Sequence, residues 1–184
     1  MTPIEKYLQH LDNIFQVEPE FYKENSLDKG HTGVTNIVYK NIPEKGMTTA
    51  LTYGLSTVKH KDWEYGRPEL CISVESTNDA WAQIAGFLAN QLRGKFPFCY
   101  GQTINFRGRI SDDSDMDAFL IFAPSILDRE DFLDVDIGLD YKINIAGLYP
   151  IYSSEFKKID ELGLEGFWKH PNFDLYNLKR KKVE

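Results

Sequence analysis

Apolar side chains recur every three or four residues at the start of the chain, at Ile4, Tyr7, Leu8, Leu11, Ile14 and Phe15. Residues at this spacing share one face of an α-helix, so the pattern predicts an amphipathic helix. Thr2 and Glu5 match a Thr-x-x-Glu capping box, and Pro3 suits the first helical position. Pro19 marks the end of the helix, because the residue before a proline is disfavoured in helical conformation.

A second apolar stripe of the same period predicts a helix over residues 79–93, with Asn78 or Asp79 as its cap. Its members are Trp81, Ile84, Ala85, Leu88 and Leu92. Gly94 can adopt the left-handed conformation that ends many helices. Gly86 inside this helix costs roughly 1 kcal/mol relative to alanine, which suggests that the helix packs closely against a sheet.

Runs of β-branched and aromatic residues bounded by turn residues predict strands elsewhere. They cover residues 34–39, 48–55, 69–74, 102–106, 118–122 and 137–146. A third helix is expected from Ser154 to about Leu162, and the basic end from Lys179 to Lys182 is expected to be frayed. No internal repeat or linker divides the chain. We therefore predict one α+β domain over residues 1–184, with a mostly antiparallel sheet packed by helices.

The charge of the chain changes this picture, because it is unevenly distributed. The 184 residues carry a net charge of −7. Residues 111–140 hold ten acids and a single base, Arg129, which gives that segment −9 and leaves +2 for the rest. Nucleic acids and anionic membrane surfaces attract lysine and arginine, so neither is an expected partner.

The apolar residues and the cysteines indicate where the protein works. No run of about 18 apolar residues could span a membrane, and the polar N-terminus does not resemble a signal peptide. Cys71 and Cys99 are too few for a disulfide framework and lie in apolar surroundings. Two reduced, buried thiols in a cytoplasmic protein are the expectation.

Sites of catalysis or metal binding have no signature in this sequence. Cys-x-x-Cys, His-x-His, Gly-x-Ser-x-Gly and phosphate-binding glycine loops are absent, and the four histidines are far apart. Asp113, Asp115 and Asp117 match positions one, three and five of an EF-hand calcium loop. However, Ala118 replaces the required glycine and Pro124 the bidentate glutamate. We therefore expect no enzyme activity, no cofactor and no dedicated metal site.

The acidic segments themselves have two interpretations. Most clusters of like charge are solvated loops. Closely spaced carboxylates can also imitate a phosphate backbone and occupy a basic protein cleft, where they speed association.

Five motifs in succession resemble the Suppressor of fused (SuFu) domain family across roughly residues 30–165. They are Thr52–Ser56 (TYGLS), Arg67–Ile72 (RPELCI), the helix with Trp81, Phe98–Ile104 (FCYGQTI), and Leu148–Tyr152 (LYPIY) followed by Glu155. Gly54 suggests a bulge or a close backbone approach. Arg67 and Glu69 could form a charge pair, Pro150 would end its strand, and Glu155 would favour the start of the next helix.

The resemblance is to a short bacterial member, and it implies a binding function. Animal members bind a transcription factor as cytoplasmic regulators, while short bacterial members resemble immunity proteins of polymorphic toxin systems. These immunity proteins bind a cognate toxin domain, often a nuclease. The leading hypothesis is therefore an immunity protein that occludes its toxin without turnover. An interaction module without a toxin, and a metal-dependent hydrolase built on the carboxylates, remain alternatives.

The predicted toxin-facing residues are the acids of the two segments, 112–117 and 128–136. They are Asp112, Asp113, Asp115, Asp117, Asp128, Glu130, Asp131, Asp134 and Asp136. Charge reversal there is expected to slow association with a basic partner. Tyr141 or Phe132 is expected to supply an aromatic anchor of the kind that dominates interface energies.

Overall fold

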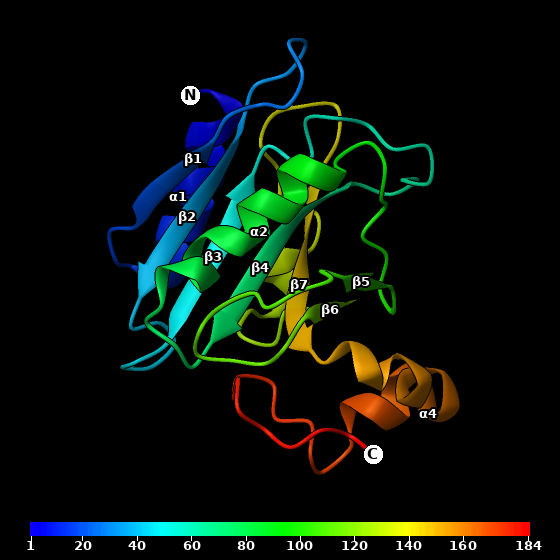
Figure 1. Ribbon diagram of the computed structural model, residues 1–184. Coiled ribbons are helices and arrows are strands. Elements are labelled where there is room, and N and C mark those ends of the chain that lie inside the picture. Colours follow the sequence, from blue (N-terminus) through cyan, green and yellow to red (C-terminus); the bar gives the residue numbers. More distant parts are fainter.

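The computed structural model describes residues 1–184 and contains one seven-stranded sheet (Figure 1). Its strands lie in the order β1-β2-β3-β4-β7-β6-β5. Their bounds are β1 (Glu20–Glu24), β2 (Val34–Lys40), β3 (Thr48–Tyr53), β4 (Arg67–Val74), β5 (Thr103–Asn105), β6 (Ala118–Phe122) and β7 (Ile143–Ile151). Only β4 and β7 pair in parallel, so the predicted mostly antiparallel sheet is confirmed.

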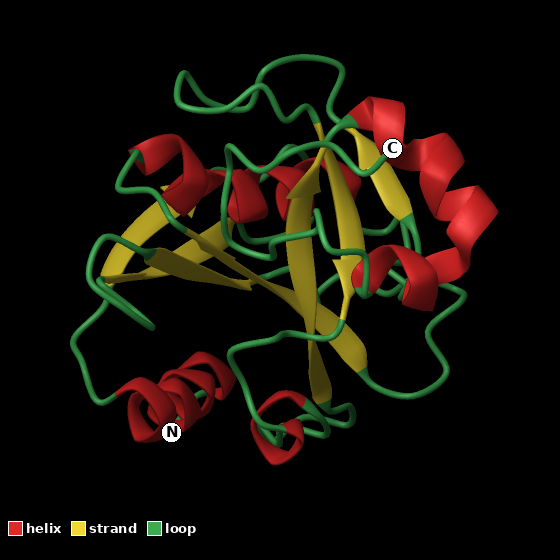
Figure 2. Cartoon of the chain, turned by 90° about the horizontal axis from the view of Figure 1, so that it is seen from below, coloured by secondary structure: helices red, strands yellow, loops and turns green.

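Helices cover both faces of this sheet. They are α1 (Pro3–Phe15), α2 (Asp79–Leu92), α3 (Arg129–Phe132), the 3-10 turn η1 (Ser153–Glu155) and α4 (Phe156–Trp168). In Figure 1, α2 crosses one face over β2, β3 and β4, and Figure 2 shows the N-terminal helix on the opposite side of the strands. No helix is both long and apolar enough to cross a membrane.

Local sequence signals explain α1 and α2. The capping box of α1 forms as expected, with the Glu5 carboxylate accepting a hydrogen bond from the Thr2 backbone N–H at 2.6 Å. Gly86 gives α2 its close approach to the sheet, since a Cβ there would lie 2.2 Å from the Asn36 side chain of β2. Asn36 in turn accepts a hydrogen bond from the Gly86 N–H at 2.7 Å. The predicted close packing is therefore confirmed.

Three hydrophobic clusters fill the space between helices and sheet. The largest lies under α2 and includes Trp81 and Phe119, both fully buried. A second lies between α1 and the opposite face of β2, β3 and β4, and includes Cys71. A third lies under α4 on β6 and β7. Burial raises the pKa of the Cys71 thiol to about 12, which agrees with its prediction as an inert core residue.

The boundaries predicted for the last strand are wrong. Residues 137–142 form a turn instead, in which Gly138 has a φ of +79°, and β7 starts at Ile143. The strand also continues through Pro150. A proline is tolerated there because β4 pairs with β7 only as far as Gly147, which leaves one side of β7 without a strand neighbour.

The C-terminal segment is ordered, which corrects the expectation of a frayed tail. Arg180 is only 5% exposed, and Leu178 and Val183 are buried in core clusters. The Arg180 guanidinium donates two hydrogen bonds to the Glu155 carboxylate, at 2.7 and 2.8 Å. Glu155 therefore does more than favour a helix start, because it also fixes the end of the chain against the sheet.

A candidate partner-binding groove

The two acidic segments lie at opposite ends of β7. Segment 112–117 precedes β6, whose first residue, Ala118, pairs with Ile151 at the end of β7. Segment 128–136 reaches the other end, where Val135 forms an isolated bridge with Ile143. Eight residue steps of strand separate these ends by roughly 26 Å. The structure therefore does not bring the nine predicted acids together in one surface.

Two acids of segment 112–117 stabilise the fold. Asp113 accepts hydrogen bonds from Trp81 Nε1 at 2.9 Å, from Ser111 Oγ at 2.6 Å and from the Ser76 hydroxyl. Partial burial would raise the pKa of Asp113, but these hydrogen bonds outweigh it and lower the pKa. Asp117 accepts from the Ser153 N–H at 2.6 Å and its hydroxyl at 2.7 Å, at the start of η1. Reversing either charge would disturb the fold.

The other two acids of this segment are exposed beside basic residues. Asp115 pairs with Arg109 at 2.7 Å, and both side chains are mostly in solvent. Asp112 has no ion-pair partner, but it lines a shallow depression that also contains Arg109 and Lys179. The negative charge at this end of β7 is therefore largely balanced locally.

Segment 128–136 carries charge that is less balanced. Asp128, Glu130, Asp131 and Asp134 form no ion pair with a lysine or arginine. Asp136 is the exception. It binds the Lys142 ammonium, and this hydrogen bond, together with one from the Gly138 N–H, lowers its pKa.

The two aromatic residues expected as anchors are half-buried. Phe132 and Tyr141 pack against the cluster under α1. The Tyr141 ring is also covered by the Arg67 guanidinium, whose central carbon lies 3.9 Å from the ring centroid. Both rings therefore contribute to the core, and each keeps part of its surface exposed.

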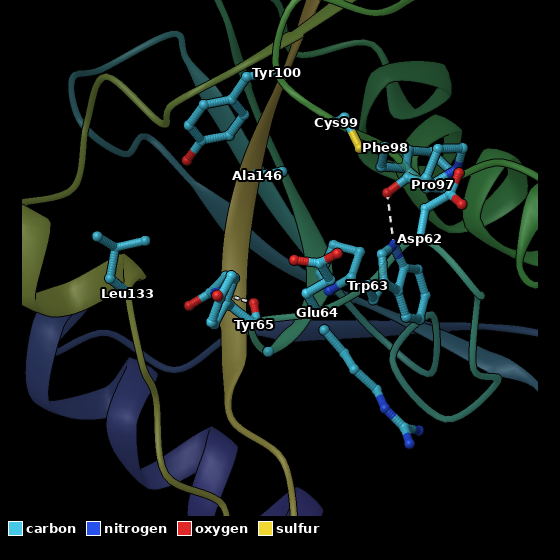
Figure 3. Close-up of a pocket in the computed structure, with 14 residues that line it drawn as sticks. Asp62, Trp63, Glu64, Tyr65, Pro97, Phe98, Cys99, Tyr100, Leu133 and Ala146 are labelled. Atoms are coloured by element: carbon cyan, nitrogen blue, oxygen red, sulfur yellow. Dashed lines mark hydrogen bonds between the residues drawn. The ribbon is translucent and has the colours of Figure 1, made fainter.

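Next to segment 128–136 lies a groove of about 470 Å³, where the parallel strands β4 and β7 begin side by side (Figure 3). Its floor includes Pro68 of β4 and Ala146 of β7. Three loops form its walls, namely residues 62–66, residues 97–100 and Leu133 after α3. Figure 3 shows Tyr100 and Leu133 on one side of Ala146 and Trp63 and Glu64 on the other. Half of the lining residues are hydrophobic.

Large exposed aromatic rings mark this groove. Tyr65 is 86% exposed and Tyr100 is 47% exposed. Neither tyrosine is among the predicted site residues, because those residues were all chosen from the acidic segments. The available signal was a pair of aromatic residues within a polar, turn-rich stretch, where no core requires them.

Side-chain hydrogen bonds tie the three walls together. Trp63 Nε1 donates to the Pro97 carbonyl at 2.8 Å and joins two of the loops. The Asn144 side chain donates to the Tyr65 carbonyl at 2.9 Å and accepts from the Asp134 N–H at 2.8 Å. The groove is therefore formed without a ligand, which reduces the ordering cost of binding.

Gly66 lies in the wall formed by residues 62–66, and its substitution tests whether the contact with Asn144 holds that wall in place. Its φ is +71°, and a Cβ there would lie 2.6 Å from Asn144 Nδ2 and 3.0 Å from the Lys142 carbonyl. We expect Gly66→Ala to destabilise the protein by about 1–3 kcal/mol through backbone strain and displacement of Asn144. Urea unfolding followed by tryptophan fluorescence measures this. Gly46→Ala is the control, because its φ is +86° but nothing lies within 4 Å of its Cβ position.

The charge pair suggested for Arg67 and Glu69 does not form. Both side chains instead bind the turn that follows β3. The Glu69 carboxylate is fully buried and accepts five hydrogen bonds, from the Thr52 and Ser56 hydroxyls and from the backbone N–H groups of residues 54, 55 and 56. Arg67 donates to the Ser56 carbonyl at 3.0 Å. This turn leads directly into the loop that forms the Trp63–Tyr65 wall.

Gly54 permits this turn by a close backbone approach, as expected. Its φ is +129°, and a Cβ there would lie 2.8 Å from the Gly33 carbonyl oxygen. Arg93 of the α2 C-cap donates to the Gly54 carbonyl at 3.2 Å. The TYGLS motif is therefore a buried structural turn.

Cys99 does not belong to the core, contrary to the prediction. It is exposed and lines the groove beside Phe98, which is buried instead. Phe98 has a φ of +55°, and this unusual conformation places its neighbour at the surface. Partial burial and the Asp62 carboxylate raise the pKa of the Cys99 thiol. No three His, Cys, Asp or Glu side chains are arranged to hold a metal ion.

The matching family model and the similar solved structures are all of Suppressor of fused proteins. The model of the Suppressor of fused protein family (SUFU) matches residues 30–181. A crystal structure of a SUFU homolog from Neisseria gonorrhoeae FA 1090 superposes with a TM-score of 0.72 at 16% identity, over 97% of this chain and 94% of that one. Drosophila Suppressor of Fused gives 0.68 at 13% identity, over 97% of this chain and 50% of that one.

A third similar structure is that of a Sufu-Fu complex, with a TM-score of 0.63 at 13% identity over 98% of this chain and 91% of that one. At these identities the structural similarities describe the fold. None of the curated proteins matches the chain by sequence.

Proposed function

The chain belongs to the Suppressor of fused protein family, and on this premise we propose that it acts by binding another protein at the preformed groove. The exposed Tyr65 and Tyr100 rings around that groove carry the proposal, since tyrosine anchors are common at interfaces. One of the similar structures is itself a complex, between Sufu and Fu. The protein works by occupancy in this proposal and catalyses no reaction.

The finer proposal is an immunity protein. Its partner is a cognate toxin domain with a basic surface, such as a nuclease, which it occludes in the cytoplasm. The support is the negative charge of segment 128–136 beside the groove, where four of the five acids have no ion-pair partner, since such a surface complements one made to hold phosphates. The 184 residues act in this proposal as one SuFu-like domain, and an interaction module without a toxin is the second candidate.

Co-expression tests this proposal. The open reading frame next to the gene is expressed in bacterial cells with and without the chain. We expect the toxin domain alone to stop growth, and the chain to restore growth and form a stoichiometric complex in size-exclusion chromatography with light scattering. A complex without toxicity would support the interaction module instead. If the neighbouring product neither binds nor inhibits growth, the immunity proposal is wrong.

A further inference from the structure

The two ends of β7 present different surfaces, although an acidic segment lies at each end. At the end with segment 112–117, two acids are used internally and the remaining two lie near Arg109 and Lys179. At the groove end, carboxylates stand without basic partners beside exposed aromatic rings. A partner that recognises negative charge would gain more at the groove end, since locally paired charges offer little field.

The groove combines features that suit a cation carried on an apolar chain. Tyr65 is exposed and Trp63 is half-buried along one wall, and the face of an aromatic ring attracts a cation. The Glu64 carboxylate lines the same wall, is exposed and has no ion-pair partner. Pro68 and Ala146 on the floor offer apolar contact to a side-chain stem or a neighbouring apolar residue.

Arg67 is the one basic residue among those that line the groove. The Arg67 guanidinium is held by the Ser56 carbonyl and stacked on Tyr141. Arg129 is the only base in segment 128–136, against five acids. Segment 128–136, which contributes Leu133 to the groove wall, therefore carries a net charge of −4.

From these observations we infer that the groove is the docking site for an extended, basic segment of a protein partner, with an arginine or lysine placed between Glu64 and the rings of Trp63 and Tyr65. This inference rests on the proposed binding function and names which of the two acidic ends performs it. Hydrogen bonds join the three walls to one another, and the groove is open at its surface. An extended chain can therefore enter it without prior unfolding of the loops.

A peptide measurement tests the inference independently of any toxin. The probe is a fluorescein-labelled peptide of alternating arginine and leucine, with a peptide of alternating glutamate and leucine as its control. We expect fluorescence anisotropy to detect binding of the basic peptide only, weakening as salt is raised. Glu64→Lys and Tyr65→Ala should each weaken it by about tenfold or more.

Asp112→Lys is the matched control for Glu64→Lys. Both positions are exposed and lack an ion-pair partner, and both substitutions change the net charge by the same amount. We expect Asp112→Lys to leave peptide affinity within about twofold, since a distant charge is screened beyond about 10 Å. Unfolding midpoints of all three variants should match that of the unchanged protein, which separates lost binding from lost folding.

The outcomes separate the inference from the proposed function. Peptide binding that Glu64→Lys abolishes and Asp112→Lys leaves intact supports the groove, even if the neighbouring toxin is not neutralised. Equal weakening by both charge reversals, or equal binding of the acidic peptide, overturns it. If the chain rescues cells from the toxin and rescue survives Glu64→Lys with Tyr65→Ala, the function stands but the groove assignment is wrong.

Discussion

Replacing Arg180 by alanine is expected to destabilise the protein by about 3–5 kcal/mol, because it leaves the Glu155 carboxylate buried without its counter-charge. Both side chains are almost fully buried, at 2% and 0% exposure. Glu155 also accepts hydrogen bonds from the backbone N–H groups of Tyr152 and Val183. Loss of the pair therefore releases both the start of η1 and the end of the chain.

Thermal and urea unfolding measure this effect. For a chain of this size, the loss corresponds to a fall in Tm on the order of 10 °C. Arg109→Ala is the matched control, since it removes an arginine from an exposed pair with Asp115 and should leave the midpoint almost unchanged. If Arg180→Ala behaved like Arg109→Ala, the tail would contribute as little as a frayed end.

The double variant Glu155→Ala with Arg180→Ala sharpens the test. Its loss should be clearly smaller than the sum of the two single losses, because neither partner is left as an unpaired buried charge. Additive losses would show that the two residues act separately. Limited proteolysis provides a structural readout, since the single variant should expose the segment after Phe173, whose ring lies 4.8 Å from the Arg180 guanidinium carbon.

Helices and most strands of this fold follow from local sequence patterns. The periodic apolar stripes, the Thr2–Glu5 capping box and the Gly86 contact are all determined by neighbouring residues or by one helical face. The parallel pairing of β4 with β7 is different, because it joins segments more than 70 residues apart. Nothing in either segment specifies that partner, so only the three-dimensional structure reveals where the groove floor lies.

The sequence shows where the acidic residues lie along the chain, but not which of them stabilise the fold and which face solvent. Asp113 and Asp112 are adjacent and chemically identical, yet Asp113 is bound by Trp81 and two serines while Asp112 faces solvent. The distinction depends on which side of the turn faces α2. For the same reason the buried position of Arg180 could not be predicted, because its partner Glu155 is 25 residues away along the chain. The segment that contains Arg180 was therefore predicted to be a frayed tail.

Replacing Glu69 by glutamine is the second change with a large expected effect. The amide would present an NH₂ group where five donors now point at the carboxylate, three of them backbone N–H groups that cannot accept. An unmet buried hydrogen-bonding group costs about 1–3 kcal/mol, and more than one is affected here. We expect a loss of about 2–4 kcal/mol at neutral pH in urea unfolding. Thr57→Val, which removes one hydroxyl bond to Gly54 in the same turn, is the milder control.

The pH dependence of that loss reports the state of the Glu69 carboxyl. Burial raises the pKa of Glu69 above its ordinary value of 4.5, and the hydrogen bonds from Thr52, Gly54 and Ser56 oppose this rise without cancelling it. The folded protein then takes up a proton more readily than the unfolded chain, so Glu69 contributes more stability as the pH falls from 7 toward 4.5. The nearby Tyr53 does not titrate in this window, since burial raises its pKa to about 12.

The free energy difference between the unchanged protein and Glu69→Gln should therefore widen as the pH is lowered, and level off below the ordinary glutamate pKa. A difference that narrows instead would mean that the donors of residues 52–56 outweigh burial and hold the carboxylate ionised. In that case the turn would be a rigid anion site, and its stability would be lost in acid. In the expected case, the turn that leads into the Trp63–Tyr65 wall is held more firmly at mildly acidic pH, and the groove stays formed there.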